Sequence, residues 1–432
     1  MSLPPRVAGL DFGTTNSVAA LADGGNGLPR LLSIEGPDGP AELFRSALCF
    51  WHDEGVRGGV AVEAGPAAIH EYLEFPSDSR FLQSFKSVAA SSSFETAPVF
   101  AKRYRFEELG RLFLSKLASH AGGGLDRIER LVVGRPVHYA GARPDAALAR
   151  TRYDAMFAGF AAEIHYVYEP LAAAFSYASR LDEPATLLVA DFGGGTSDFS
   201  VVRVDEPGAR RRCTPLGHAG VGLAGDRFDQ RIVEHLVLPR LGKGSQYRSF
   251  DKLLDIPGGW FADFSDWSKL ALMRNRRTLD ELERLRKNAV EPEAIGRMIA
   301  MIENELGLPL YEAVGRLKRA LSDDERATFR FSGAGVDLEA AVTRADFEGW
   351  IAPDLARIAA AVDEALANAG VREDEIDRIF LTGGTSLVPA VRALFTRRFD
   401  PAGIMSGGEL TSIAHGLALV AGEEDLSPWT VG

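Results

Sequence analysis

The sequence predicts an α/β protein with two similar lobes and a largely helical insert in the second lobe. Two stretches carry this prediction. GLDFGTTNSV, residues 9–18, and VADFGGGTSDF, residues 189–199, both place Asp-Phe-Gly at the end of an apolar run and follow it with small or hydroxylated residues. Strand and helix patterns follow each stretch in the same rough order, and a segment of mostly helical pattern interrupts the second series.

Most elements of the first half follow from hydrophobic periodicity. Leu109, Leu112, Phe113 and Leu117 recur at helical spacing and predict a helix over residues 107–120. The other elements expected here are a strand, glycine turn and strand over 6–23, short strands within 46–51 and 57–65, a strand at 131–133, a helix at 143–160, a strand at 163–170 and a helix at 170–181.

The second half repeats strand, glycine turn and strand after residue 185 and then becomes mostly helical over 260–325. Leu279, Leu282 and Leu285 form one apolar stripe there, and Ile295, Met298, Ile299 and Ile302 form another. A long helix over 343–370, a strand, glycine loop and helix over 376–399, and a helix at 412–420 complete the chain.

These patterns predict the domain organisation. We expect a first lobe over residues 1–184, with a small subdomain at about 41–108. The second lobe covers 185–432 and contains the insert at about 229–342. No C-terminal peptide-binding domain is expected after it.

Composition narrows the function classes. Of 432 residues, 46% are hydrophobic and 25% are charged, as in an ordinary soluble protein, and the net charge is −12. An acidic chain argues against nucleic acid or an anionic membrane surface as a partner, because both attract excess Lys and Arg. No run approaches the ~20 apolar residues that span a bilayer, and no signal peptide is evident. We therefore expect a cytoplasmic protein whose buried Cys49 belongs to the core.

The two glycine turns predict a phosphate site. Glycine tolerates positive φ and close backbone approach, so successive N–H groups of such a turn can converge on an anion, and Thr or Ser hydroxyls add donors. Neither turn contains the GxxxxGK[ST] or GxGxxG pattern. One turn alone could be a plain hairpin, but two matching turns suit a polyphosphate held from both sides. The residues concerned are Gly13, Thr14, Thr15 and Asn16 in the first turn and Gly193, Gly194, Gly195 and Thr196 in the second.

Carboxylates at the ends of the strands predict a magnesium ion. Asp11 and Asp191 end their apolar runs beside the proposed phosphates, which they would repel if no cation lay between them. Mg²⁺ commonly takes one or two carboxylates together with phosphate oxygens and several waters. Asp198 is a further candidate.

Two other segments could contact a nucleoside. LTGGTSLVP, residues 381–389, is a glycine loop between a strand and a helix, which suits phosphate or sugar, and its paired glycines leave room for a flat ring. In LYEAVGRLKRAL, the residues Gly315, Lys318, Arg319 and Ser322 share a face opposite the apolar stripe. That face is either a solvated basic surface or the lining of a cleft for ribose and purine.

Together these motifs resemble the nucleotide-binding part of the heat shock protein 70 (DnaK) family, within the actin-like ATPase superfamily. VYEPLAAAFSYA is similar to the family's interlobe Glu-Pro segment, GVGLAGDRFDQRI to its Gly-Gly-x-x-Phe-Asp segment and RFLQSFKSVAAS to the segment with the catalytic lysine. RLKRALS and FLTGGTSLVPAV resemble the two adenosine segments. The resemblance covers nearly the whole chain and is greatest to short DnaK-related proteins of the YegD type. It implies a ribonuclease H-like fold in which each lobe is a mixed sheet flanked by helices.

The resemblance also implies residue roles. Lys86 would reach the γ-phosphate, Glu169 would position Mg²⁺ and the attacking water, and Asp11 and Asp191 would hold Mg²⁺ through water, with Asp191 also catalytic. Further nucleotide contacts would come from Gly225, Asp226, Lys318, Arg319, Ser322, Gly383, Gly384 and Thr385. Gly315 and Leu387 stand where the family usually has Glu and Arg, which predicts altered ribose and base contacts.

The expected function is slow, Mg²⁺-dependent ATP hydrolysis by a DnaK-like chaperone, with a client protein or co-chaperone as partner. A nucleotide-gated binding module without significant turnover is the main alternative. A small-molecule kinase with Asp145 or Asp154 as base, or a filament-forming actin relative, are two others.

Overall fold

The structure is a computed structural model, and it describes residues 6–23, 29–37, 39–76, 78–141, 143–205, 213–270, 273–333, 335–408 and 410–431. The chain divides into two compact units. The larger unit comprises Met1–Glu71, Gln83–Gly225 and Asp354–Gly432, and the smaller comprises Tyr72–Leu82 and Asp226–Pro353. The larger unit thus takes its residues from both halves of the sequence. The lobe boundary at residues 184 and 185 stays a prediction.

The first sheet of the larger unit is built around β1 (Arg6–Phe12), whose apolar residues are buried. Its strand order is β11-β10-β1-β2-β3, with β4 paired to β2. β1 is antiparallel to β2 and parallel to β10, and β10 is parallel to β11. These partners are β2 (Asn16–Asp23), β3 (Arg30–Leu31), β4 (Phe44–Arg45), β10 (Arg130–Arg135) and β11 (Glu163–Tyr168).

The second sheet repeats this arrangement around β12 (Ala185–Phe192), which is buried along its whole length. The order is β14-β13-β12-β19-β20, with β13 antiparallel and β19 parallel to β12. Both sheets therefore have an antiparallel hairpin on one side of the central strand and two parallel strands on the other. The predicted internal symmetry is confirmed. The remaining strands are β13 (Ser197–Val204), β14 (Cys213–Val221), β19 (Arg378–Thr382) and β20 (Ile404–Ser406).

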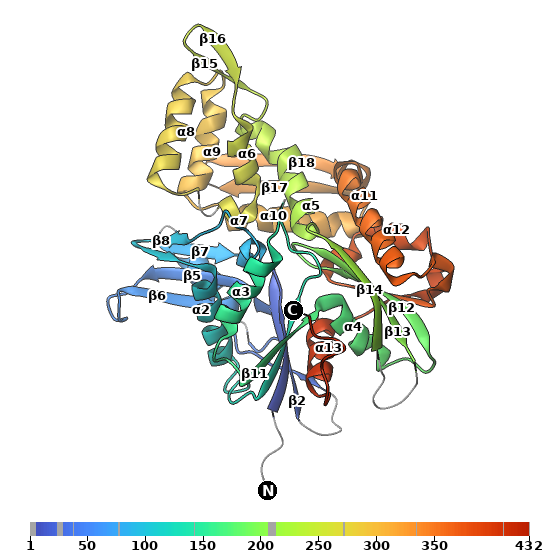
Figure 1. The fold of residues 1–432 in the computed structure, drawn as a ribbon. Helices are drawn as coiled ribbons and strands as arrows, with labels where there is room; N and C mark the ends of the chain where they lie inside the picture. Colours follow the sequence, from blue (N-terminus) through green and yellow to red (C-terminus); the bar gives the residue numbers. More distant parts are fainter. Residues whose placement is uncertain are drawn as a thin grey trace. The chain divides into compact units, whose positions relative to one another are not determined.

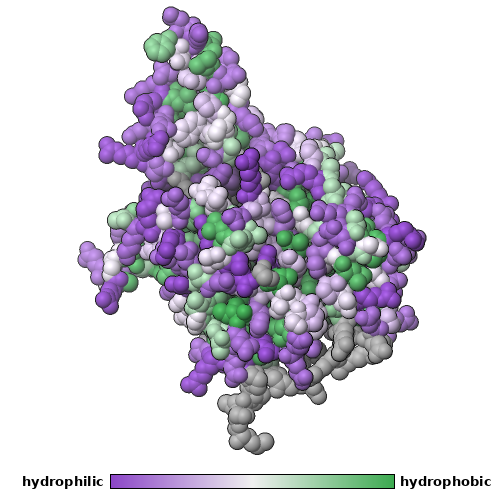
Figure 2. Space-filling view, in the orientation of Figure 1, coloured by the Kyte–Doolittle hydropathy of each residue, from purple (hydrophilic) through white to green (hydrophobic). Residues whose placement is uncertain are grey.

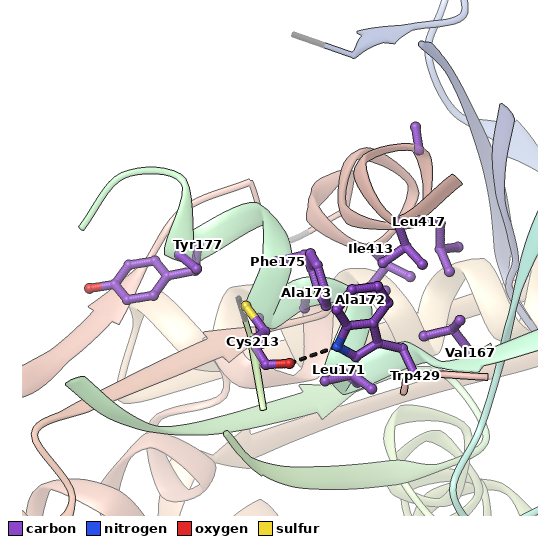
Figure 3. Close-up of a cluster of buried hydrophobic side chains, with 14 of the residues drawn as sticks. Val167, Leu171, Ala172, Ala173, Phe175, Tyr177, Cys213, Ile413, Leu417 and Trp429 are labelled. Atoms are coloured by element: carbon purple, nitrogen blue, oxygen red, sulfur yellow. Dashed lines mark hydrogen bonds between the residues drawn. The ribbon is translucent and has the colours of Figure 1, made fainter. Parts of the chain in front are cut away.

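Two helices lie between these sheets and form the core of the unit (Figure 1). α4 (Glu169–Ala178) packs on β12, β13 and β14, whereas α13 (Ser412–Ala421) packs on β1, β2 and β10. Each helix also packs on the other, so each half of the sequence covers the sheet of the other half. Figure 3 shows Trp429 beside α4, where its indole Nε1 donates to the Cys213 carbonyl at 2.7 Å. Both cysteines are buried and free.

The two core helices approach so closely that Gly416 has no room for a side chain. A Cβ there would lie 1.7 Å from the carbonyl oxygen of Ala172. We therefore expect Gly416→Ala to lower the free energy of unfolding by about 2–4 kcal/mol, because the helices must separate. Urea denaturation followed by circular dichroism measures this. Gly349→Ala, on an exposed helix face where a Cβ meets nothing, is the control, and equal losses in both variants would contradict the prediction.

The first sheet carries two further helices, α2 (Phe106–His120) and α3 (Ala146–Phe157), which pack on each other. Their buried aromatic side chains meet Phe12 of β1, with ring centroids 5.6 Å from Phe113 and 6.1 Å from Tyr153. Both helices were predicted. The smaller elements of the chain up to residue 104 are β5 (Ala47–His52), β6 (Val60–Ala64), α1 (Gly65–Glu74), β7 (Ser79–Gln83), the 3₁₀ helix η1 (Phe85–Val88), β8 (Ala97–Val99) and β9 (Lys102–Tyr104).

The smaller unit contains the helices predicted for the insert. Leu282, Ile295, Met298 and Ile302 are buried as their stripes predicted. Tyr72 and Arg80 join this unit by hydrogen bonds to Glu305, which Arg274 also binds. Its helices are α5 (Gly225–Ile232), η2 (Val233–Val237), η3 (Leu238–Leu241), α6 (Gly258–Ser265), α7 (Trp267–Leu270), α8 (Arg276–Asn288), α9 (Pro292–Glu303), α10 (Gly307–Asp323) and the start of α11 (Arg344–Ala369).

Two hairpins in this unit were missed by the sequence analysis. β17 (Arg326–Gly333) pairs with β18 (Val336–Thr343), and the buried Phe329 and Phe331 alternate with exposed residues, which is the signal that could have revealed the strands. β15 (Gln246–Ser249) pairs with β16 (Lys252–Asp255), and Figure 2 shows apolar side chains at the end of this hairpin, where Phe250 is fully exposed.

The remaining helices belong to the larger unit. η5 (Gly384–Leu387) and α12 (Pro389–Thr396) follow β19, and the short η4 (Glu373–Glu375) and η6 (Pro401–Gly403) lie in loops. Among the described residues, no helix is long and apolar enough to cross a membrane. The cytoplasmic location stays a prediction.

Candidate functional site

The two glycine turns have the same construction. In the first sheet the last paired residues are Phe12 and Ser17, and in the second they are Phe192 and Ser197, so each turn contains four residues. The residues of both turns are partly exposed, whereas these flanking residues are buried. Each sheet therefore presents one accessible backbone turn at the end of its central strand.

The two turns face each other within the larger unit. A Cβ built on Gly195 would lie 3.3 Å from the hydroxyl of Thr14. A Cβ on Gly13 would lie 2.0 Å from the Asn16 carbonyl oxygen, and the Gly193 N–H donates to the Thr196 carbonyl at 3.0 Å. Glycine is required at Gly13 and gives close approach at Gly195, which leaves backbone N–H groups accessible from both sides of one space.

Ser46 braces the first turn, and the sequence analysis missed it. Its hydroxyl donates to the Gly13 carbonyl at 2.7 Å, and its N–H donates to the Thr15 carbonyl at 2.9 Å. Its own carbonyl accepts from the N–H of Ser84, two residues before Lys86. A serine directly before a buried strand gives no pattern in the sequence that distinguishes it from an ordinary loop residue.

The third glycine loop packs directly on the second turn. Gly383 has φ of 81°, and a Cβ there would lie 2.1 Å from the carbonyl oxygen of Phe192. The Gly193 carbonyl accepts from the hydroxyl of Thr385 at 3.1 Å and from the N–H of Gly225 at 3.5 Å. The structure therefore brings together the predicted residues of both turns, Gly225 and the 383–385 loop.

Four carboxyl groups and one lysine form the centre of the site, which we call the carboxylate cluster: Asp11, Glu169, Asp191 and Asp198, with Lys86. Lys86 Nζ binds Glu169 Oε1 at 2.6 Å, and both side chains are 7% exposed. Asp191 and Asp198 are buried and directly opposite each other on β12 and β13, whereas Asp11 is partly exposed. The cluster has more acidic groups than the bound lysine can neutralise.

Burial and mutual repulsion shift the protonation equilibria of the cluster. Burial raises the pKa of Asp11 to about 7, helped by the charge of Glu169 and opposed by Lys86. Burial and the neighbouring carboxylates also raise the pKa of Asp191 well above its usual value. Burial acts to lower the pKa of Lys86, but Glu169 and Asp11 outweigh it and the pKa lies above its usual value. The lysine stays charged while the carboxyls are poised to take up a proton or a cation.

Asp198 is held so that one oxygen has a partner and the other does not. Its Oδ1 accepts from the backbone N–H of His138 at 2.9 Å, and Oδ2 is buried without a hydrogen-bond partner in the described structure. Burial raises the pKa of Asp198 to about 7, with a contribution from Glu169. Gly220 makes room for this carboxyl, since a Cβ there would lie 2.4 Å from Oδ1. An unpartnered buried oxygen of this kind is expected where a ligand or water binds.

The cluster suits a divalent cation held through water. Among the described residues, no three Asp, Glu, His or Cys side chains come close enough to ligate a metal directly. The unpartnered Asp198 Oδ2, the excess of carboxyls and the open glycine turns fit a hydrated Mg²⁺ bound to phosphate. Asp11 and Asp191 are the residues that would bind its water shell.

Four predicted nucleotide residues lie in the smaller unit. Lys318, on α10, binds Asp229 of α5 at 2.7 Å, and the Ser322 hydroxyl donates to the Lys318 carbonyl at 3.1 Å. Arg319 is exposed, and Asp226 lies in the first turn of α5. Their contact with a nucleotide stays a prediction. On the larger unit, Leu387 is 58% exposed at the third loop.

A family model described as Hsp70 protein matches residues 83–244 and 300–422, which is more than half of the chain. The chain belongs to the Hsp70 family. The two-lobed actin-like ATPase fold that the sequence predicted is thereby confirmed, together with membership of a family of ATP-binding chaperones. Hsp70 proteins bind ATP or ADP with Mg²⁺ and bind client proteins. The narrower resemblance to the YegD type stays a prediction.

The Hsp70 match includes the segments that carry Lys86, Glu169 and Asp191, but the first glycine turn lies outside it. The identical pairing of the two hairpins therefore supports the role of that first turn independently of the match. The two kinase-base candidates have structural partners instead. Asp145 accepts from the N–H of Leu148 and caps α3, and Asp154 binds Arg150 on the exposed face of the same helix.

Proposed function

We propose that this Hsp70-family chain binds ATP with Mg²⁺ in the larger unit and hydrolyses it slowly. The observation that supports this most is the carboxylate cluster, which surrounds a buried lysine beside two facing glycine turns. Bound Mg²⁺ would neutralise charge on the phosphates and the carboxyls. Everything else in the reaction needs positioning and hydrogen bonding, which the chain's own groups can supply.

Each part of the cluster has a task in this proposal. The backbone N–H groups of Gly13–Asn16 and Gly193–Thr196 bind phosphate oxygens from opposite sides. Lys86, oriented by Glu169, donates to the terminal phosphate and stabilises the charge that develops on it. Asp198 Oδ2 accepts a hydrogen bond from the attacking water, and a pKa of about 7 suits a group that takes up its proton near neutral pH.

Phosphate release from purified protein tests the proposal. We expect release that requires ATP and Mg²⁺ and stops when EDTA is added, at a rate above that of Lys86→Ala protein purified in parallel. Calorimetry with ATP distinguishes the main alternative, since binding without release would indicate a nucleotide-gated binding module. Neither binding nor release would refute both. A chaperone role towards client proteins is proposed on the family membership alone.

Gly134 allows a sharper test of Glu169. A Cβ at Gly134 would lie 3.0 Å from Glu169 Cγ and 3.3 Å from Leu417 Cδ1, so an added methyl must displace one of these side chains. We expect Gly134→Ala to slow phosphate release by about tenfold, because Glu169 loses its alignment with Lys86. Its position inside a buried strand is the sequence signal that could have revealed it.

Gly296→Ala is the matched control, since a Cβ there meets Arg286 at an ordinary distance of 3.6 Å. Both variants are measured for phosphate release and for thermal unfolding. Unchanged release in Gly134→Ala would show that the position of Glu169 does not limit the reaction.

A further inference from the structure

Lys86 lies on a segment with little regular structure of its own. It belongs to the four-residue η1, which follows Ser84 in the left-handed region at φ of 54°. After η1 the chain continues to Phe94 through isolated turns, in which Ser91 N–H donates to Val88 and Phe94 N–H donates to Ser91. Short 3₁₀ turns hold their shape poorly without tertiary contacts. Something else must therefore fix the position from which Lys86 extends.

One side chain, Arg152 of α3, binds the carbonyl groups of this segment. Its Nη1 donates to the carbonyls of Val88 and Ala89, each at 2.9 Å, and to that of Ser91 at 3.1 Å. Its Nη2 donates to the Phe94 carbonyl at 2.5 Å, and the guanidinium lies 5.8 Å from the centre of the Phe94 ring. A planar guanidinium with several donors can bind four carbonyls at once, whereas the three donors of a lysine ammonium cannot.

Arg152 itself is held on a rigid element that also contacts the strand of Asp11. The next residue, Tyr153, is fully buried and packs on Phe12, which follows Asp11 in β1. At the other end of α3, the Asp145 N–H donates to the Ala90 carbonyl at 2.9 Å. α3 therefore connects the lysine segment to the strand that carries a cluster carboxylate.

We propose that Arg152 is a positioning residue for Lys86. By binding the Val88, Ala89, Ser91 and Phe94 carbonyls, it holds η1 so that the ammonium group meets Glu169 and the terminal phosphate. This inference rests on the proposed ATP hydrolysis for its kinetic consequence. Its structural consequence, a fixed 85–94 segment, does not depend on that function.

Two variants and a double-mutant cycle test the kinetic consequence. We expect Arg152→Ala to lower the rate at saturating ATP by about tenfold and to change KM little, because Lys86 is misplaced and the glycine turns are intact. Arg152→Lys, which keeps the charge and most of the stem, should fold if Arg152→Ala does not and should lose about as much activity. In a Lys86→Ala background, Arg152→Ala should have almost no further effect on the rate.

Arg111→Ala is the matched control. Arg111 also binds a carbonyl of α3, that of Ala155, through Nε at 2.8 Å and Nη2 at 2.6 Å, but it does not bind the lysine segment. A loss in Arg152→Ala no greater than in Arg111→Ala, or a full additional loss in the Lys86→Ala background, would overturn the proposal. Either result would indicate an ordinary contribution to stability.

Amide hydrogen exchange of the 85–94 segment separates this proposal from the proposed function. Faster exchange in Arg152→Ala or Arg152→Lys than in Arg111→Ala, limited to that segment, is the expected result whether or not ATP is hydrolysed. If the unmodified protein releases no phosphate, the proposed function fails, and the exchange rates alone decide the role of Arg152. Unchanged exchange in that segment would overturn it.

Discussion

Replacing Lys86 with alanine is expected to reduce Mg²⁺-dependent phosphate release by about 100–1,000-fold, while ATP still binds. The ammonium group is 2.6 Å from Glu169 Oε1 in a buried site, so no water is positioned to replace it as a donor of full positive charge. The glycine turns, which carry most of the proposed phosphate contacts, are untouched by the substitution. The rate should therefore fall much more than the affinity.

Single-turnover phosphate release and ATP calorimetry measure these two effects separately. Lys116→Ala is the control, because Lys116 also pairs with a glutamate, Glu63 at 3.2 Å, but is partly exposed and lies on α2. A variant at position 86 that hydrolyses ATP as fast as the Lys116→Ala protein would remove Lys86 from the mechanism. Equal losses of rate and affinity would instead indicate that Lys86 contributes to binding in general.

Replacing Asp191 with asparagine is expected to lower hydrolysis and to stabilise the metal-free protein. The carboxyl is buried opposite Asp198, and burial and neighbouring acids raise its pKa well above the usual value. Asparagine has nearly the same shape without the charge. We expect phosphate release to fall by about 10–100-fold, because the residue that would bind the Mg²⁺ water shell is lost.

The stabilising effect follows from the sign of the shift. A carboxyl with a raised folded-state pKa binds a proton more tightly in the folded than in the unfolded protein, so stability falls as pH rises above its unfolded pKa. Asp11 and Asp198, each raised to about 7, place the fall in metal-free stability between about pH 4 and 7. At pH 8 in EDTA, Asp191→Asn removes one unfavourable buried charge. We expect its melting temperature to rise by about 1–4 °C.

Differential scanning calorimetry at pH 5 and pH 8, with EDTA or with Mg²⁺ and ATP, checks this. The wild-type protein should gain more stability from Mg²⁺ and ATP than the variant does, because the ligand relieves the same repulsion. Asp374→Asn, at an exposed side chain paired with Arg372, should change neither quantity. A lower melting temperature for Asp191→Asn in EDTA at pH 8 would contradict the proposed repulsion within the cluster.

The glycine turns could be found from the sequence because their chemistry is local. Asp-Phe-Gly followed by small residues is contiguous at both places, and each turn forms between two neighbouring strands of one hairpin. The helices of the insert and the buried stripe on α9 were predictable for the same reason, since helical periodicity depends only on nearby residues. The roles of Lys86 and Glu169 came instead from a resemblance to a family, which the Hsp70 match then showed.

By itself, the sequence determined which residues form the two strand pairs, their turns and most of the helices, because these depend on contacts between neighbours in the chain. Only the tertiary structure joined Lys86 to Glu169, 83 residues away, and placed Ser46, Gly134 and Arg152 around them. It also exchanged α4 and α13 between the two sheets. Such long-range contacts are selected by the burial of whole faces and by the few directions in which a buried polar group finds a partner, and no local pattern records either.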